Sequence, residues 1–261
     1  MVTTNTTIAT DPRYTERREQ FADRMIAAIN SAGLTMMISI GHRTGLFDHM
    51  MEMDWATSSL IADRAGLKER YVREWLGAMV TGGVVEYDPK NKTYRLPPEH
   101  GSCLTRASSP DNLAVMTQWI SILGRVEDRI VEAFHRGGGV AYEEFHRFHE
   151  VMREESAQTV VATLLEHILP LVPGLTLRLE RGIRVLDVGC GAGRALMRMA
   201  ATFPASSFTG FDLCEEAIEM ARKEACERAL ENVQFEKRDV VRLDEPESFD
   251  LVTAFDAIHD Q

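Results

Sequence analysis

Hydrophobic and polar residues alternate with two different periods along the chain. In the first two thirds, apolar side chains recur every three to four positions, as Phe21, Met25 and Ile29 do, which predicts amphipathic helices. Further on, short apolar runs predict strands at 183–188, 207–212, 233–238 and 250–255, with helices at 193–202 and 215–229. Strands that alternate with helices indicate a parallel sheet. The pattern therefore predicts a helical first part and an α/β second part.

Between residues 15 and 108 the expected elements follow one another in a recognisable order. Ser58 can cap a short helix that ends at Gly66, and a second helix is expected from about Lys68 to Val80. Two short strands, at 84–87 and 93–96, then flank a turn that is rich in Asp, Pro and Asn. Helix, turn, helix and hairpin in this order predict a winged helix.

Four segments follow from these elements. We expect a disordered polar tail over 1–14, a winged-helix domain over 15–108, a helical linker and lid over 109–175, and the α/β domain over 176–261. In the linker, a helix from Leu113 to Phe134 should end before the three glycines 137–139, and a second helix should run through His167.

Composition narrows the class of protein. The net charge of -11 argues against a general binder of nucleic acid, because affinity for phosphate backbones needs an excess of Lys and Arg. The four cysteines form no CxxC pair, which is typical of a reduced, cytoplasmic protein. The polar N-terminal stretch does not resemble a secretion signal, and we expect no membrane span.

The most informative segment is the end of the first predicted strand. Asp187 is followed by Gly189, Gly191 and Gly193, and glycines here allow a sharp turn and let a ligand lie against bare backbone. Leu196 stands where a dinucleotide-binding motif has its last glycine, and the Asp187 carboxylate would repel a pyrophosphate. A nicotinamide dehydrogenase is therefore disfavoured, and a ligand with a nearby cationic group is favoured.

Acidic residues also follow the next two predicted strands. Asp212 ends the second strand, where a carboxylate can accept hydrogen bonds from both hydroxyls of a ribose. Asp239 and Val240 follow the third strand, where a carboxylate and a backbone N–H can pair with an adenine. The carboxyl ends of parallel strands share one edge of the sheet, so we expect these groups to surround one ligand.

With these motifs, residues 183–261 resemble the amino-terminal half of the class I S-adenosylmethionine-dependent methyltransferase domain. Segment 210–217 resembles the second motif of that family, with Cys214 where Ser is more usual, and 238–240 resembles the adenine-side motif. The resemblance implies S-adenosylmethionine as cofactor. It also implies that the cofactor-binding residues are Asp187, Gly189, Cys190, Gly191, Gly193, Asp212, Leu213, Asp239, Val240 and Phe255.

The N-terminal part resembles that of small-molecule methyltransferases with a winged-helix dimerisation domain. This resemblance implies a small-molecule methyl acceptor, methylated on oxygen or nitrogen, and a homodimer formed through residues 15–108. The family's sheet has seven strands, whereas this sequence ends soon after the fourth. We therefore expect a Rossmann-like domain that is truncated after strand four. A fragment of a longer protein is favoured over an inactive methyltransferase remnant.

Several side chains leave alternatives open. Tyr142 and Phe145 follow the three glycines and belong either to a flap over the cofactor or to a packed helix–helix turn. His259, after the fourth strand, is either a general base for the acceptor or a loop histidine. His146 and His149 could be metal ligands, although a solvated helix face is favoured and no metal is expected.

The winged helix leaves one further alternative. Lys68, Arg70 and Arg73 could face the phosphates of a DNA duplex, which would make the protein a regulator that senses a cofactor-like ligand. Glu69 and Glu74 interrupt this charge, and a scaffold or dimerisation role is favoured.

Overall fold

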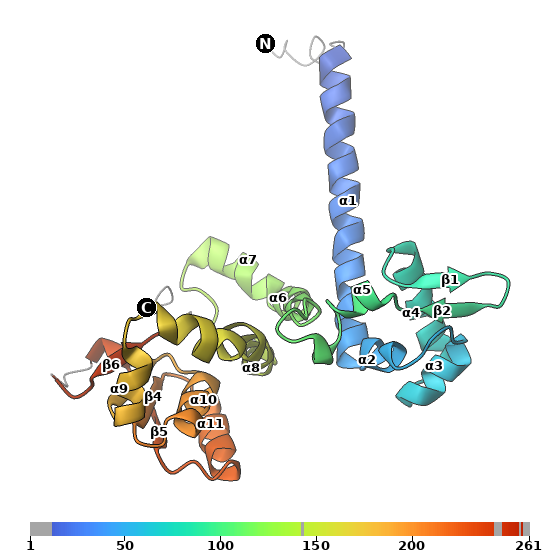
Figure 1. Ribbon diagram of the computed structural model, residues 1–261. Helices are drawn as coiled ribbons and strands as arrows, with labels where there is room; N and C mark the ends of the chain where they lie inside the picture. Colours follow the sequence, from blue (N-terminus) through green and yellow to red (C-terminus); the bar gives the residue numbers. More distant parts are fainter. Residues whose placement is uncertain (1–11, 142–143, 243–246, 256, 258–261) are drawn as a thin grey trace, which may run out of the picture. The chain divides into compact units, whose positions relative to one another are not determined.

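The computed structural model describes residues 12–141, 144–242, 247–255 and 257 (Figure 1). The chain divides into two compact units. The first unit comprises Met1–Ala107 and Thr117–Gly124, and the second comprises Ser108–Met116 and Arg125–Gln261. The three tryptophans of the chain, Trp55, Trp75 and Trp119, all belong to the first unit.

The first unit has the helix–helix–hairpin order that the sequence predicts. Up to Ser108 its elements are α1 (Pro12–Arg43), α2 (Leu46–Met51), α3 (Ser58–Ala65), α4 (Glu69–Thr81), β1 (Glu86–Asp88), β2 (Thr93–Arg95), α5 (Pro98–Gly101) and the 3-10 turn η2 (Arg106–Ser108). Strands β1 and β2 pair antiparallel with Tyr87 opposite Tyr94. The winged-helix prediction is thus confirmed (Figure 1).

Local contacts explain where the central helices begin and end. Thr57, not the expected Ser58, caps α3, because Thr57 Oγ1 accepts a hydrogen bond from the Leu60 N–H at 3.3 Å. Ser58 instead donates from its hydroxyl to Glu69 at 2.7 Å. The helix ends at Gly66, whose φ of 67° is left-handed.

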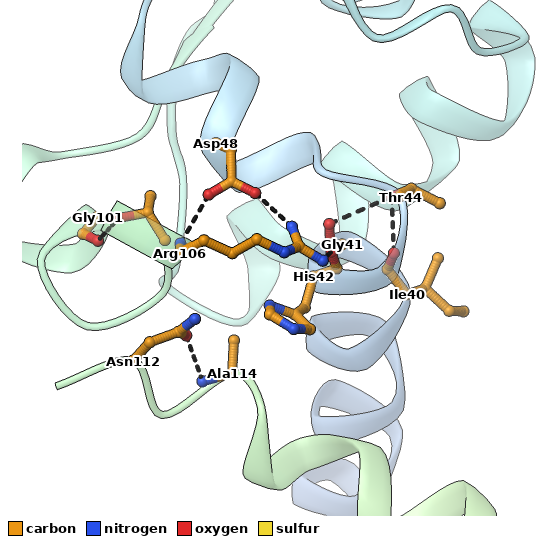
Figure 2. A network of polar contacts seen from close by, with 10 residues as sticks. Ile40, Gly41, His42, Thr44, Asp48, Gly101, Arg106, Asn112 and Ala114 are labelled. Atoms are coloured by element: carbon orange, nitrogen blue, oxygen red, sulfur yellow. Dashed lines mark hydrogen bonds and ion pairs between the residues drawn. The ribbon is translucent and has the colours of Figure 1, made fainter. Parts of the chain in front are cut away.

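The core of the first unit forms around α4 and the end of α1. Trp75 is 2% exposed, and its ring nitrogen donates to the Met37 carbonyl at 2.8 Å. A polar network also joins Arg106 to Asp48 on α2 and to His42 near the end of α1 (Figure 2). The Arg106 backbone N–H donates to Asp48 at 2.7 Å, and its guanidinium donates to the same carboxylate and to the His42 carbonyl at 2.8 Å. These contacts hold the segment around Arg106 against α2 and the end of α1.

Helix α1 exposes an unusually apolar surface. It begins at Pro12, so the predicted tail is wrong in its last residues, 12–14, which are helical. Between Arg24 and Arg43 it contains no charged residue, and by length and hydropathy it is apolar enough to cross a membrane, contrary to expectation. Only 17% of its most apolar window is buried. An exposed apolar surface of this kind is typical of a site that a partner protein or a membrane covers.

The second unit contains a parallel sheet preceded by helices. Its elements after residue 126 are α7 (Glu127–Arg136), α8 (Phe148–Ser156), the π-helical segments η5 (Ala157–Val161) and η6 (Leu164–Ile168), η7 (Leu169–Leu171), α9 (Leu175–Arg181), β3 (Arg184–Val188), α10 (Arg194–Thr202), β4 (Ser207–Asp212), α11 (Glu215–Glu227), β5 (Val233–Lys237), η8 (Val240–Arg242) and β6 (Leu251–Thr253). All four predicted strands and both predicted helices between them are confirmed, with ends shifted by at most two residues.

The sheet has the order β5-β4-β3-β6, and every neighbouring pair is parallel. Central strand β3 is buried along Val185, Leu186 and Asp187, as expected of a strand covered on both faces. Strand β6 forms one edge of the described sheet, and its Val252 is 59% exposed. The alternation of strand and helix therefore produces the predicted α/β layer.

The helical segment before the sheet is less regular than its apolar pattern predicts. The continuous helix expected from Leu113 to Phe134 is wrong. The segment instead forms a 3-10 turn, η3 (Met116–Gln118), then α6 (Trp119–Arg125) and α7, separated at Val126. The following helix begins only at Phe148, after Arg147 with a left-handed φ of 69°, and then widens into η5 and η6. Each π-helical segment is only five residues long, about one turn, which is too short for the apolar spacing to reveal the change from the α-helical period.

Candidate functional site

The turn between β3 and α10 has the geometry that its glycines predict. Gly189, Gly191 and Gly193 have φ angles of 67°, 53° and 71°, all left-handed. The Gly189 and Cys190 N–H groups both donate to the Phe211 carbonyl at the end of β4, at 2.8 and 3.0 Å. The turn is therefore held against β4, the strand whose last residue is Asp212.

Asp187 lies beneath this turn with its carboxyl group removed from water. The residue is 2% exposed and accepts a hydrogen bond from the Thr253 hydroxyl on β6 at 2.7 Å. Burial raises the pKa of the Asp187 carboxyl to about 7, the Thr253 hydrogen bond opposes the rise, and the Asp212 carboxylate adds to it. A cation placed beside Asp187 would stabilise its ionised form.

Asp212 joins the glycine turn to the start of α11. One carboxylate oxygen accepts from the Gly191 N–H and the other from the Cys214 N–H, both at 2.8 Å. Each oxygen can accept more than one hydrogen bond, so ligand hydroxyls can still be bound. Asp212 thus shapes the backbone of the site in addition to the ribose contact that the sequence predicts.

A hollow of about 90 Å³ lies above the turn. Asp187, the segment from Gly189 to Ala195 and Phe255 form one wall. The other wall is a single face of α8, made by His149, Met152, Arg153 and Ser156, which follow the i, i+3, i+4, i+7 spacing of one helix face.

The α8 wall was missed by the sequence reasoning. The solvated-face interpretation holds for His146, which is exposed, but is wrong for His149, which lines the hollow and lies 3.0 Å from Cys214. Among the described residues, no group of three or more His, Cys, Asp or Glu could hold a metal ion. The sequence does show polar residues at helical spacing in α8. Which way their side chains point depends on how the helix packs, and only the fold defines that.

Three arginines surround one carboxylate beside the hollow. Arg153 and Arg194 lie 3.6 and 3.7 Å from Glu224, and Arg228 is paired with the same carboxylate. Burial lowers the pKa of Arg194, and the nearby guanidinium groups of Arg153 and Arg228 also lower it. Arg153 and Arg194 line the hollow. The site therefore combines a buried acid with an excess of positive charge, which suits a ligand that carries both an ammonium and a carboxylate.

The remaining predicted residues lie in several places. Leu213 is 55% exposed beside Asp212, and Asp239 is exposed and accepts from the Val241 N–H at 3.0 Å. Val240 begins η8 after β5, at the same sheet edge as Asp212. Phe145 packs on the Phe148 ring at 6.1 Å between centroids. Tyr142 and His259 lie outside the described residues.

A parallel sheet in this order, a glycine turn after β3 and a carboxylate at the end of β4 are features of a class I methyltransferase domain. Residues 179–261 match the family model of a methyltransferase domain, and residues 32–106 match that of an Rv2258c-like winged HTH domain. The chain thus joins a winged helix-turn-helix domain to a methyltransferase domain.

A curated relative from Amycolatopsis mediterranei (strain S699), 27-O-demethylrifamycin SV methyltransferase, is 34% identical over 115 residues, which are 42% of this chain and 40% of the relative. The chain spans less than half the length of the curated relatives it matches. What those whole enzymes do therefore does not follow for this chain from the match alone.

Solved structures share the fold over most of the chain. Mitomycin 7-O-methyltransferase MmcR matches 95% of this chain and 74% of its own, with a TM-score of 0.66 and 15% identity. Human N-acetylserotonin methyltransferase, solved in complex with SAM, matches 92% of this chain and 72% of its own, with a TM-score of 0.62 and 17% identity. At these identities the likeness establishes the fold.

Proposed function

We propose that the chain binds S-adenosylmethionine and that the protein transfers its methyl group to an oxygen atom of a small-molecule acceptor. The observation that carries the proposal is the buried Asp187 beneath the glycine turn, with Arg153 and Arg194 lining the same hollow. The relatives and neighbours named above include O-methyltransferases of small molecules, which supports the acceptor class.

The residues fit the methionine end of this cofactor. Asp187 would receive the ammonium, because its buried carboxyl group has a raised pKa and gains most from a cation. Arg153 would pair with the cofactor carboxylate, since it lines the hollow and shares Glu224 with two other guanidinium groups. Asp212 would hold the ribose, and Asp239 with Val240 the adenine.

The cofactor supplies an electrophilic methyl group on a good leaving group. The task of the protein is then mainly to position the two reactants and keep water out. The glycine turn and Asp212 provide a rigid backbone, and α8 covers one side of the hollow. A general-base role for His259 stays a prediction.

Isothermal titration with S-adenosylhomocysteine tests cofactor binding, because this product retains the ammonium, carboxylate and ribose. Asp187→Asn and Arg153→Gln should each weaken binding about tenfold or more, as expected for loss of one buried charge contact. Arg228→Gln is the matched control for Arg153→Gln, since Arg228 pairs with the same Glu224 but does not line the hollow. It should leave the dissociation constant within about twofold.

A second ligand distinguishes contacts with the methionine end of the cofactor from contacts with its nucleoside end. 5′-Methylthioadenosine lacks the ammonium and carboxylate, so its affinity should not change in Asp187→Asn or Arg153→Gln. Absence of S-adenosylhomocysteine binding at millimolar concentration, or equal losses for both ligands in these variants, would rule out the proposed cofactor geometry.

We also propose a homodimer formed through the first unit, in a cytoplasmic protein. The support is the exposed apolar surface of α1, which includes Phe21, Ile26 and Ile29 at 53%, 57% and 71% exposure. The four cysteines are free thiols, as a reducing compartment would keep them.

A further inference from the structure

A thiol and an imidazole are in direct contact beside the glycine turn. Cys214 Sγ lies 3.0 Å from His149 Nε2, and both side chains are half-buried. His149 lies in the first turn of α8 and Cys214 directly precedes α11, so the pair joins two elements that are 65 residues apart in sequence. In this geometry the imidazole can accept the thiol proton as the sulfur forms a new bond.

The start of α11 adds a second activating influence. Cys214 is the N-cap residue of this 13-residue helix, and its sulfur makes no capping hydrogen bond. The positive end of the helix dipole stabilises negative charge that develops on the sulfur. Glu215 and Glu216 oppose this effect, but Glu215 is paired with Lys237 at 3.5 Å and Arg222 at 3.9 Å.

The other cysteines lack this environment. Cys226 is exposed and lies in the last turn of the same helix, at the negative end of the dipole. Burial raises the pKa of the Cys190 thiol well above its ordinary value, which makes that sulfur a poor nucleophile. Cys103 is half-buried in the first unit. Cys214 is therefore the cysteine whose surroundings favour reaction.

We propose that Cys214, assisted by His149, is a covalent modification site for soft electrophiles, including hydroperoxides, at the rim of the cofactor site. With hydrogen peroxide, Sγ attacks one peroxide oxygen and the O–O bond breaks. The thiol proton passes to His149 Nε2 and then to the departing hydroxide. Sulfur is oxidised to a sulfenic acid, and the peroxide is reduced to water.

Modification and cofactor binding then compete. His149 also lines the hollow above the glycine turn, so a group attached to Cys214 displaces a wall residue of that hollow. A cofactor bound in the hollow would in turn hold His149 in place and restrict access to the sulfur beside it. This part of the inference rests on the proposed function.

Alkylation with iodoacetamide at pH 7, followed cysteine by cysteine with peptide mass spectrometry, tests the site on the 261-residue chain. Cys214 should react about tenfold or more faster than Cys226. In His149→Asn the Cys214 rate should fall to that of Cys226, while the Cys226 rate stays unchanged. Cys190 should remain unlabelled in both proteins, which shows that the second unit is still folded.

Two outcomes overturn the proposal: Cys214 reacting no faster than Cys226, or a Cys214 rate that His149→Asn leaves unchanged. Saturating S-adenosylhomocysteine should slow Cys214 at least about fivefold and leave Cys226 unaffected. If S-adenosylhomocysteine binds but does not slow the alkylation of Cys214, modification and cofactor binding do not compete. If titration shows no binding of S-adenosylhomocysteine, the proposed function fails, whereas fast, His149-dependent labelling of the free chain still supports the modification site.

Discussion

Asp187 combines two properties that oppose each other in the free protein. Its position beneath the glycine turn is where a cationic ligand would need a carboxylate, but burial penalises the charge when no ligand is present. Since the folded-state pKa of about 7 exceeds the unfolded value near 3.8, the folded chain binds more protons between these values. Stability from this residue is therefore lost as the pH rises from 4 towards 7, and the loss is complete above 7.

Asp187→Asn should for this reason stabilise the free protein more at pH 8 than at pH 4. The gain in the free energy of unfolding at pH 8, relative to pH 4, should be about 1–4 kcal/mol, the upper figure corresponding to the whole pKa shift. Urea denaturation of both proteins at the two pH values measures it. A difference between the proteins that does not depend on pH would contradict the pKa assigned to Asp187.

At the residue scale, the sequence predicts the site residues that belong to a backbone motif, but not those that a helix distant in sequence contributes. Asp187 and Asp212 could be found because each ends an apolar strand, and strand ends meet at one sheet edge. His149 and Arg153 could not, because each lies more than thirty residues before β3, on a different element. Nothing in their spacing showed that they face the glycine turn rather than water.

At the scale of single elements, different positions of the glycine turn require glycine for different reasons. A Cβ at Gly193 would overlap the Phe235 ring on β5, whereas a Cβ at Gly191 would meet open space. Both positions have left-handed φ angles. Gly191 is therefore required by backbone conformation, and Gly193 by conformation and by the close approach of α10 to β5.

Gly193→Ala should destabilise the second unit much more than Gly191→Ala. The Gly191 variant should cost about 1 kcal/mol for the left-handed backbone alone. The Gly193 variant should cost about 3–5 kcal/mol, because overpacking against Phe235 adds to the same strain. Urea unfolding followed by far-ultraviolet circular dichroism compares the two variants, and equal losses would show that Phe235 moves aside without cost.

The helices before the sheet show the limit of pattern-based prediction. Their apolar residues gave the correct class of structure, but the break at Val126 and the π-helical segments η5 and η6 depend on packing. The positions of the strands were easier to predict, because turn residues on both sides of a short apolar run leave few choices for where the strand begins and ends. The edge strand β6 was likewise predictable from the fourth apolar run.

On the scale of the whole molecule, the proposed dimer depends on the exposed apolar surface of helix α1. If its apolar surface forms a dimer, Ile29→Asp should raise the dimer dissociation constant about tenfold or more, because a carboxylate would be buried at the interface. Size-exclusion chromatography with light scattering measures this. Tyr71→Asp is the control, since Tyr71 is 75% exposed in the same unit but lies on α4.

A wild-type chain that is monomeric at about 50 µM, well above the dissociation constants of stable homodimers, would contradict the dimer proposal. Flotation with neutral lipid vesicles distinguishes a second explanation for α1. If the wild-type chain floats with the vesicles and Ile29→Asp does not, the apolar surface of α1 serves a membrane, and the expectation of no membrane partner is wrong.

The placement of all three tryptophans in the first unit has an optical consequence. Indole emission reports on the first unit, which holds the winged helix-turn-helix domain and Trp119 of α6, whereas backbone ellipticity reports on both units together. The methyltransferase domain has no intrinsic indole signal of its own. A single tryptophan introduced there, at an exposed position away from the hollow such as Leu177, would give each unit a separate fluorescent signal.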